Sequence, residues 1–278
     1  MTQSILYALD FDGVICDSAV ETGMTGWKAA SQIWSDMQGP VPAVLIEQFR
    51  LLRPIIETGY EAILAMRLLH LGNSVDNIYS SYVDKTQALL AQAQVTTDDL
   101  KQLFGQTRDT WIAEDLADWV AMNPLFPNVA EKLQQLGQRH SWLIITTKQE
   151  RFVKQILQAN AIELADQHIY GLDRNLSKVE VLKNLLNQPT EPNIYFVEDR
   201  LPTLLNVAKQ PELAGVKLIF ALWGYNTDAD KALALEQGLL LHALDQFNRL
   251  RLIGGLVYRF GWLWYIRPQY LICYRIVL

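Results

Sequence analysis

The sequence has only two cysteines among its 278 residues, and Cys16 and Cys273 stand at opposite ends of the chain. Two such distant thiols supply neither a disulfide framework nor a cysteine-based metal site. The four histidines are also scattered, without the spacing of metal ligands. These absences favour a reducing compartment, so we expect a cytoplasmic protein.

Positive charge is scarce before the C-terminal segment. Residues 1–248 carry 19 basic side chains against 30 acidic ones, a net charge of −11, whereas residues 249–278 contain five arginines and no acid. An acidic body offers no electrostatic footprint for a phosphate backbone, so nucleic-acid binding is not expected. The first apolar run, Ile5–Leu9, lacks the flanks of a signal peptide and ends at Asp10. It is interpreted as a buried strand.

The basic C-terminal tail, residues 249–278, also contains seven aromatic side chains. Its uncharged stretches do not exceed seven residues. A transmembrane helix needs roughly 18–20 apolar residues, so the tail cannot span a bilayer as a helix. It could lie on a membrane surface, or it could pack against the body of the protein or a partner. Both alternatives stay open, as does the oligomeric state.

Short apolar runs alternate with helical patterns through most of the chain. The runs expected to be strands after Ile5–Leu9 are Trp142–Thr146, Ile194–Val197, Val216–Leu222 and, more weakly, His168–Leu172. Helices are expected between them at 129–136, 150–160, 178–186 and 201–209. This alternation predicts an α/β fold with a doubly wound parallel sheet.

Residues 18–122 interrupt this alternation, because one helical pattern follows another. Helices are expected at about 19–37, 43–70, 75–93 and 97–121, with Thr97 as the N-cap of the last one. The chain is therefore divided into an α/β core of residues 1–17 and 123–248, a helical cap of residues 18–122, and the tail of residues 249–278.

Polar side chains cluster in sequence where the expected strands end. In an open parallel sheet these strand ends form the site. The residues concerned are Asp10 and Asp12 after the first strand, Thr146, Thr147 and Lys148 after the second, Lys178 at the start of a helix, and Glu198 and Asp199. Gly13 permits the sharp turn that lets the first two carboxylates face one site. Grouped carboxylates need a cation, and oxygen ligands suit Mg²⁺.

This set of residues suits phosphoryl transfer. Asp10 is the candidate nucleophile, which would form an aspartyl-phosphate, and Asp12 is its acid/base partner. Lys178 and the hydroxyl of Thr146 would bind the phosphoryl oxygens. Arg53 precedes Pro54, so a helix end there could aim its guanidinium at an acidic substrate. The alternative is that the arginines of this helix are solvated surface charges.

Four segments resemble, in the same order, the four motifs of the haloacid dehalogenase superfamily, and most closely its phosphoglycolate phosphatase-related branch. They are DFDGVICDS from Asp10, IITTK with Thr146, LSKVEVL with Lys178, and VEDR with Glu198 and Asp199. The resemblance covers most of residues 4–248. It implies a Rossmann-like core with a type I helical cap, and Mg²⁺ held by Asp10, Asp199, Glu198 and the backbone carbonyl of Asp12. Thr147 and Lys148, which follow Thr146 at the same strand end, are candidate substrate contacts.

One departure from the motifs concerns the metal. Glu198 stands where many relatives have glycine, and Thr203 stands where they have a second aspartate. Which of Glu198 and Asp199 touches the metal is therefore open.

The expected function is Mg²⁺-dependent hydrolysis of a small phosphorylated metabolite, and the resemblance makes phosphoglycolate the first candidate. A phosphomutase of the same superfamily is one alternative. A non-catalytic protein that senses phosphate or binds a partner is another. A dehalogenase is disfavoured, because that reaction has no use for the acid/base Asp12.

Overall fold

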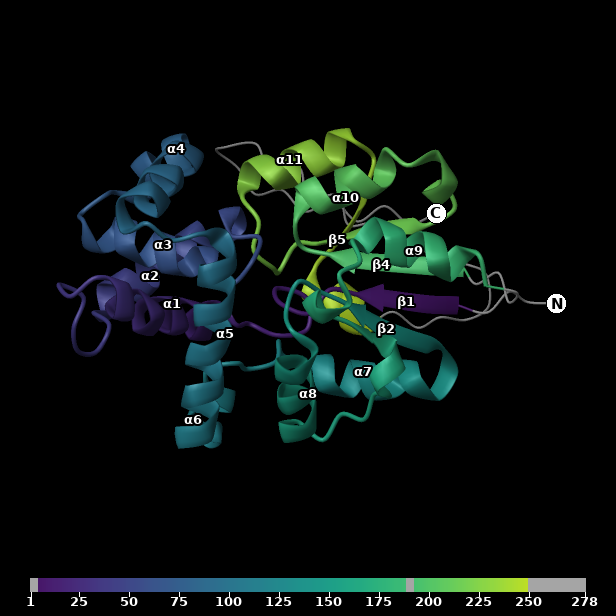
Figure 1. Cartoon of the computed structure of the whole chain (residues 1–278). Coiled ribbons are helices and arrows are strands. Elements are labelled where there is room, and N and C mark those ends of the chain that lie inside the picture. Colours follow the sequence, from purple (N-terminus) through teal and green to yellow (C-terminus); the bar gives the residue numbers. More distant parts are fainter. Residues whose placement is uncertain (1–4, 189–192, 250–278) are drawn as a thin grey trace, which may run out of the picture.

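The computed structural model describes residues 5–188 and 193–249 (Figure 1). The expectations for the basic tail therefore lie outside the described residues, apart from Arg249 at its start. Among the described helices, none has the length and apolar character needed to cross a membrane.

Six parallel strands form one sheet in the order β3-β2-β1-β4-β5-β6. Their bounds are β1 Ile5–Leu9, β2 Ser141–Ile145, β3 Ile169–Tyr170, β4 Asn193–Glu198, β5 Lys217–Ala221 and β6 Leu240–His242. The predicted doubly wound parallel sheet is confirmed. The weak strand expected at 168–172 is reduced to two residues, and β6 was not expected, because its three residues give too short a pattern.

The direction of the chain across the sheet reverses at β1, which pairs with β2 on one side and with β4 on the other. The connections on either side of such a reversal diverge, and they leave a crevice at the carboxyl ends of the two strands. Asp10 follows β1, Glu198 is the last residue of β4, and Asp199 follows it. The topology alone therefore brings the first and last sequence motifs together.

Helices cover both faces of the sheet (Figure 1). Tyr7 and Leu9 of β1 belong to one apolar core with α7 (Val129–Arg139), α8 (Glu150–Ala159) and α12 (Leu244–Arg249). The alternate residues Leu6 and Ala8 belong to a second core with α9 (Lys178–Leu186), α10 (Leu201–Ala208) and α11 (Asp228–Glu236). A strand buried on both faces is a continuous apolar run in sequence, as β1 is. Three short 3₁₀ turns complete this part: Asp166–His168, Leu172–Arg174 and Pro211–Leu213.

Six helices lie between β1 and α7 and form the helical insertion, seen beside the strand ends in Figure 1. They are α1 (Ala19–Ile33), α2 (Ala43–Leu52), α3 (Glu61–His70), α4 (Val75–Ala93), α5 (Thr97–Glu114) and α6 (Leu116–Ala121). They enclose an apolar core of their own, which includes Phe49, Leu100 and Phe104. The insertion therefore has its own packing, and Trp111 of α5 and Trp119 of α6 join it to the apolar core of the sheet.

The structure corrects three details of the expected helices. The helix expected over 43–70 is interrupted by a 3₁₀ turn, Arg53–Ile55, because Pro54 cannot donate a backbone hydrogen bond. The helix expected over 97–121 breaks at Asp115, whose side chain accepts a hydrogen bond from Asp118 N at 2.9 Å and starts α6. Thr96 rather than Thr97 is the N-cap of α5, because it forms a capping box with Asp99.

Candidate active site

Two glycines, one in the turn after β1 and one after β5, pack closely against Asp199. Gly13 has φ of 89°, and a Cβ there would lie 2.0 Å from Asp199 Oδ2. Gly224, after β5, approaches from the other side, where a Cβ would lie 2.3 Å from both Asp199 Cβ and the Gly13 carbonyl oxygen. A side chain at either position would displace Asp199. Gly13 was expected to matter, whereas the close approach of Gly224 had no signal in the sequence.

Three buried carboxylates meet at the carboxyl ends of β1 and β4. Ligand oxygens of Asp10, Glu198 and Asp199 lie within 4.8 Å of one another. Lys178, at the start of α9, donates from Nζ to Asp10 Oδ1 and to Glu198 Oε2, at 2.7 Å each. The structure thus brings together four of the residues singled out in the sequence.

The charges of this cluster are not balanced. Burial raises the pKa of Asp10 to about 7, although Lys178 opposes the shift. Burial and the charges of Glu198 and Asp10 raise the pKa of Asp199 well above its ordinary value. Asp199 Oδ2 accepts from the Tyr225 backbone N at 2.6 Å, whereas the buried Oδ1 has no partner among the described residues. An all-oxygen donor set with excess negative charge and a bare oxygen fits a hard divalent cation such as Mg²⁺.

Asp12 lies in a different environment, although only one residue separates it from Asp10. Its carboxylate accepts a hydrogen bond from Lys148 Nζ at 2.9 Å. Burial favours the neutral acid, but the positive charges of Lys148 and Arg53 outweigh burial and lower the pKa of Asp12 to about 2. The side chain of Asp12 is outside the cluster of three carboxylates. The surroundings of the two aspartates of the first motif therefore shift their pKa values in opposite directions, upward for Asp10 and downward for Asp12.

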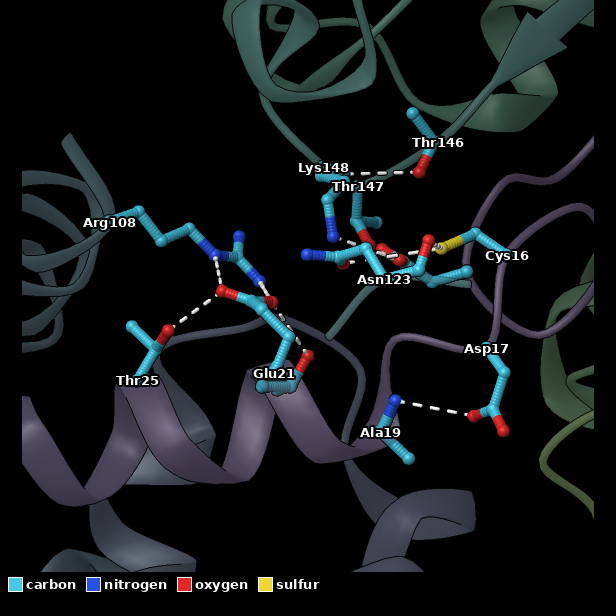
Figure 2. Close-up of polar contacts among 12 residues, drawn as sticks. Cys16, Asp17, Ala19, Glu21, Thr25, Arg108, Asn123, Thr146, Thr147 and Lys148 are labelled. Atoms are coloured by element: carbon cyan, nitrogen blue, oxygen red, sulfur yellow. Dashed lines mark hydrogen bonds and ion pairs between the residues drawn. The ribbon is translucent and has the colours of Figure 1, made fainter. Parts of the chain in front are cut away.

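The second motif lies at the boundary with the helical insertion. Thr146 is buried, and its Oγ1 accepts from Lys148 N at 3.1 Å (Figure 2). The hydroxyl of Thr147 points the other way and donates to the Glu57 carbonyl oxygen of the insertion at 3.0 Å. Thr147 thus joins the two parts of the molecule, while Lys148 turns inward to Asp12.

Of Arg50, Arg53 and Arg67, the arginines of the helix expected over 43–70, only Arg53 is turned to the site. Arg50 pairs with Asp17 at 3.0 Å, and Arg67 pairs with Asp36 at 2.7 Å. Arg53 is buried, with Nη1 donating to the Ile56 carbonyl and its guanidinium 4.4 Å from the centre of the Tyr225 ring. It forms no ion pair with a described carboxylate, and its buried Nε has no partner among the described residues. The expected surface-charge alternative therefore does not apply to Arg53.

A cavity of about 50 Å³ lies between the sheet edge and the helical insertion. Asp12, Lys148 and Thr147 line it from the core, and Arg53, Tyr60, Lys101, Phe104 and Arg108 line it from the insertion. Sequence analysis missed the last four of these. They are single positions on helices, and a helix position acquires a meaning only when tertiary packing decides which way the helix faces.

Solved structures of other proteins have a similar fold over most of this chain. A phosphoglycolate phosphatase predicted for Haemophilus somnus 129PT is 20% identical, with a TM-score of 0.56 over 89% of this chain and 96% of that one. A hydrolase of the haloacid dehalogenase family from Deinococcus radiodurans R1, with bound phosphate and sodium, is 13% identical, with a TM-score of 0.51 over 90% and 94%. A phosphatase predicted for Clostridium acetobutylicum is 16% identical, with a TM-score of 0.53 over 89% and 98%.

The chain has the fold of the haloacid dehalogenase-like hydrolases. The resemblance inferred from the four motifs is thereby confirmed at the level of the fold. No protein-family model matches the sequence, and no curated protein matches it. At identities of 20% and below, similarity of structure does not by itself assign a reaction. The assignment of a reaction rests on the geometry of the site.

Proposed function

We propose that this protein is a Mg²⁺-dependent phosphatase that hydrolyses a small phosphomonoester through an aspartyl-phosphate on Asp10. The observation that carries the proposal is the pair of environments at the end of β1. Asp10 sits among the carboxylates that could hold a cation. Asp12 lies outside that group, and its carboxylate accepts a hydrogen bond from Lys148 Nζ at 2.9 Å. A nucleophile and an acid/base need different electrostatic surroundings, and these two aspartates have them.

In the first step the Asp10 carboxylate attacks phosphorus, and the bond from phosphorus to the leaving oxygen breaks. Asp12 donates a proton to that oxygen. Asp12 is ionised in the free protein, since Lys148 and Arg53 keep its pKa at about 2. A bound phosphate dianion would draw both cations to itself, and Asp12 could then take up from solvent the proton that it donates.

In the second step Asp12 takes a proton from water, and the water attacks the phosphoryl group. The acyl phosphate bond breaks, phosphate leaves and the Asp10 carboxylate is restored. Lys178 Nζ contacts Asp10 and Glu198, so it is placed to neutralise phosphoryl oxygens through both steps. Buried Thr146 supplies a hydroxyl at the same strand ends.

Asp10, Asp199 and, following the family resemblance, the Asp12 backbone carbonyl would hold the metal, which would neutralise charge on the phosphoryl group. Glu198 has a different part in this proposal. Its Oε2 accepts from Lys178 and its Oε1 accepts from Arg200 N at 3.0 Å, whereas Asp199 Oδ1 has no partner among the described residues. We therefore assign direct ligation to Asp199, with Glu198 holding Lys178.

The test of the proposal is release of inorganic phosphate from a panel of phosphomonoesters with Mg²⁺ and with EDTA. Asp199→Ala should raise the Mg²⁺ concentration needed for half-maximal activity steeply, and Glu198→Gln should raise it less. The matched control is Asp228→Ala, an exposed acid on α11 paired with Lys231. Equal Mg²⁺ requirements in Asp199→Ala and the control would refute the placement of the metal.

Phosphoglycolate is the first ester to try. Two proteins of similar structure are predicted to be phosphoglycolate phosphatases. The cavity beside Asp12 is small, about 50 Å³, which is consistent with a compact leaving group. A sugar phosphomutase is distinguished by its product, a rearranged sugar phosphate without phosphate release.

A further inference from the structure

We infer that Arg108, held in place by Glu21, binds a negative charge on the leaving group of the substrate. The inference rests on the proposed phosphatase activity and narrows its substrate class to small phosphomonoesters with an anionic leaving group. Arg108 would be a specificity-determining residue and Glu21 a positioning residue.

Arg108 is almost completely buried, with 5% of its surface exposed, yet it lines the cavity that also contains Asp12. Its Nε donates to Glu21 Oε1 at 2.7 Å, and its Nη2 donates to Glu21 Oε2 at 2.6 Å. Nη1 makes no hydrogen bond with any described residue, and in Figure 2 this nitrogen points away from the Glu21 carboxylate. One edge of the guanidinium is therefore fixed, and the other is available to a ligand.

Glu21 is itself held on several sides, so the orientation of Arg108 is set in advance. Thr25 Oγ1 donates to Glu21 Oε1 at 2.7 Å (Figure 2). Trp119 Nε1 donates to the same oxygen at 3.0 Å. Glu21 is completely buried, and Arg108 lowers its pKa against the effect of burial. A planar guanidinium fixed in this way presents its remaining donors in one direction, which favours recognition of a planar carboxylate.

Arg108 also bridges the two parts of the molecule. Its guanidinium carbon lies 4.4 Å from the ring centre of Phe104 on α5 and 5.2 Å from that of Phe152 on α8. Aromatic rings beside the guanidinium exclude water and strengthen a charge-assisted contact. Arg108 therefore lies at the boundary between the insertion and α8, where the cavity is.

The two buried arginines of the cavity have different positions relative to the carboxylates. The guanidinium of Arg53 lies 4.4 Å from the centre of the Tyr225 ring, and the backbone N of Tyr225 donates to Asp199 at 2.6 Å. Arg108 instead lies beside the rings of Phe104 and Phe152 and lines the same cavity as Asp12. We therefore place Arg53 on the phosphoryl side and Arg108 on the side of the leaving group, next to Asp12, which would protonate that group.

The experiment compares 2-phosphoglycolate with ethyl phosphate, which have leaving groups of similar size with and without a carboxylate. The wild type should prefer phosphoglycolate in kcat/KM. A hydrogen-bonded charge contact contributes roughly 1.5–3 kcal/mol, so Arg108→Met should lower kcat/KM for phosphoglycolate about 30-fold and for ethyl phosphate only about threefold or less. A purely structural role would lower both rates equally.

Two further variants guard against loss of folding. Arg108→Lys keeps a charge for Glu21 but loses the planar fork, and it should retain the fold and lose most of the preference. Arg151→Met is the matched control, because Arg151 also lies over the Phe152 ring and crosses the boundary to Asp109 at 2.8 Å, but it does not line the cavity. Its preference should equal that of the wild type.

Binding measured by calorimetry with Asp10→Asn and Mg²⁺ gives the same comparison without turnover. Equal losses for both esters in Arg108→Met and Arg108→Lys, or no wild-type preference in rate or binding, would overturn the role of Arg108 and leave the phosphatase proposal standing. A wild type without turnover whose binding preference depends on Arg108 would refute the proposed function instead and retain the anion site.

Discussion

The two buried acid–base clusters of this molecule differ in their balance of charge. At the strand ends lie three carboxylates, Asp10, Glu198 and Asp199, and among the described residues only Lys178 forms ion pairs with this cluster, through Asp10 and Glu198. In the insertion, Glu21 faces its own guanidinium, Arg108, and three neutral donors. Burial is nearly complete in both, yet the pKa of Asp10 rises to about 7 whereas that of Glu21 falls. The balance of charge, rather than the degree of burial, therefore distinguishes the cluster that needs a cation from the cluster that stabilises the insertion.

The largest expected effect breaks the unbalanced cluster at its nucleophile. Asp10→Asn keeps the size of the side chain but cannot attack phosphorus, so phosphate release should fall by about 10⁴-fold or more with the fold intact. Circular dichroism checks the fold. The control is Asp84→Asn, an exposed acid on α4. Wild-type rates in a contamination-free preparation of Asp10→Asn would eliminate covalent catalysis.

The next effect breaks the balanced cluster. Glu21→Ala leaves Arg108 buried without its carboxylate, and losing one partner of a buried ion pair costs about 3–5 kcal/mol of unfolding free energy. Urea unfolding measures the loss. Glu114→Ala, at the end of α5 and outside the described ion pairs, is the control. A Glu21→Ala protein as stable as the control would mean that the pair does not hold the insertion together.

The pH dependence of stability sharpens the comparison in metal-free protein. A carboxyl group whose pKa is raised on folding stabilises the fold at low pH, and this stabilisation is lost as pH rises toward the folded pKa. For Asp10, whose pKa is raised by burial to about 7, unfolding in EDTA should require about 2 kcal/mol less at pH 8 than at pH 5. Asp10→Asn should reduce this difference, and Mg²⁺ should restore stability at pH 8. A pH dependence identical in both proteins would assign the effect to other groups.

The smallest expected effect has the opposite sign from Glu21→Ala. Asp199→Asn removes one charge from the unbalanced cluster, so the metal-free protein should gain unfolding free energy at pH 8, by less than Glu21→Ala loses. The gain should disappear in saturating Mg²⁺, because the wild type binds the ion more tightly. Destabilisation in EDTA would show that the hydrogen bond from Tyr225 N to Asp199 outweighs the repulsion.

The two regions also differ in how far the sequence predicted them. The first and last motifs follow apolar strands, and parallel strands of one sheet end at one edge, so the meeting of Asp10 with Glu198 and Asp199 could be expected from order alone. The α9 helix runs over Lys178–Leu186 as expected, because Ser177 and Glu180 form a capping box. Lys178, at its first position, is thereby aimed at the strand ends.

The sequence by itself determined the order of the four motifs along the chain. It also determined the sharp turn at Gly13 and the carboxylate chemistry of the site, because these depend on residues that are close together in the chain. Only the tertiary structure decided that Lys148 serves Asp12, that Gly224 must be small, and that Arg108 faces the cavity. Those contacts join segments far apart in sequence. A helix reveals its apolar side through its period, but which polar residue meets a distant strand end depends on how the helices pack.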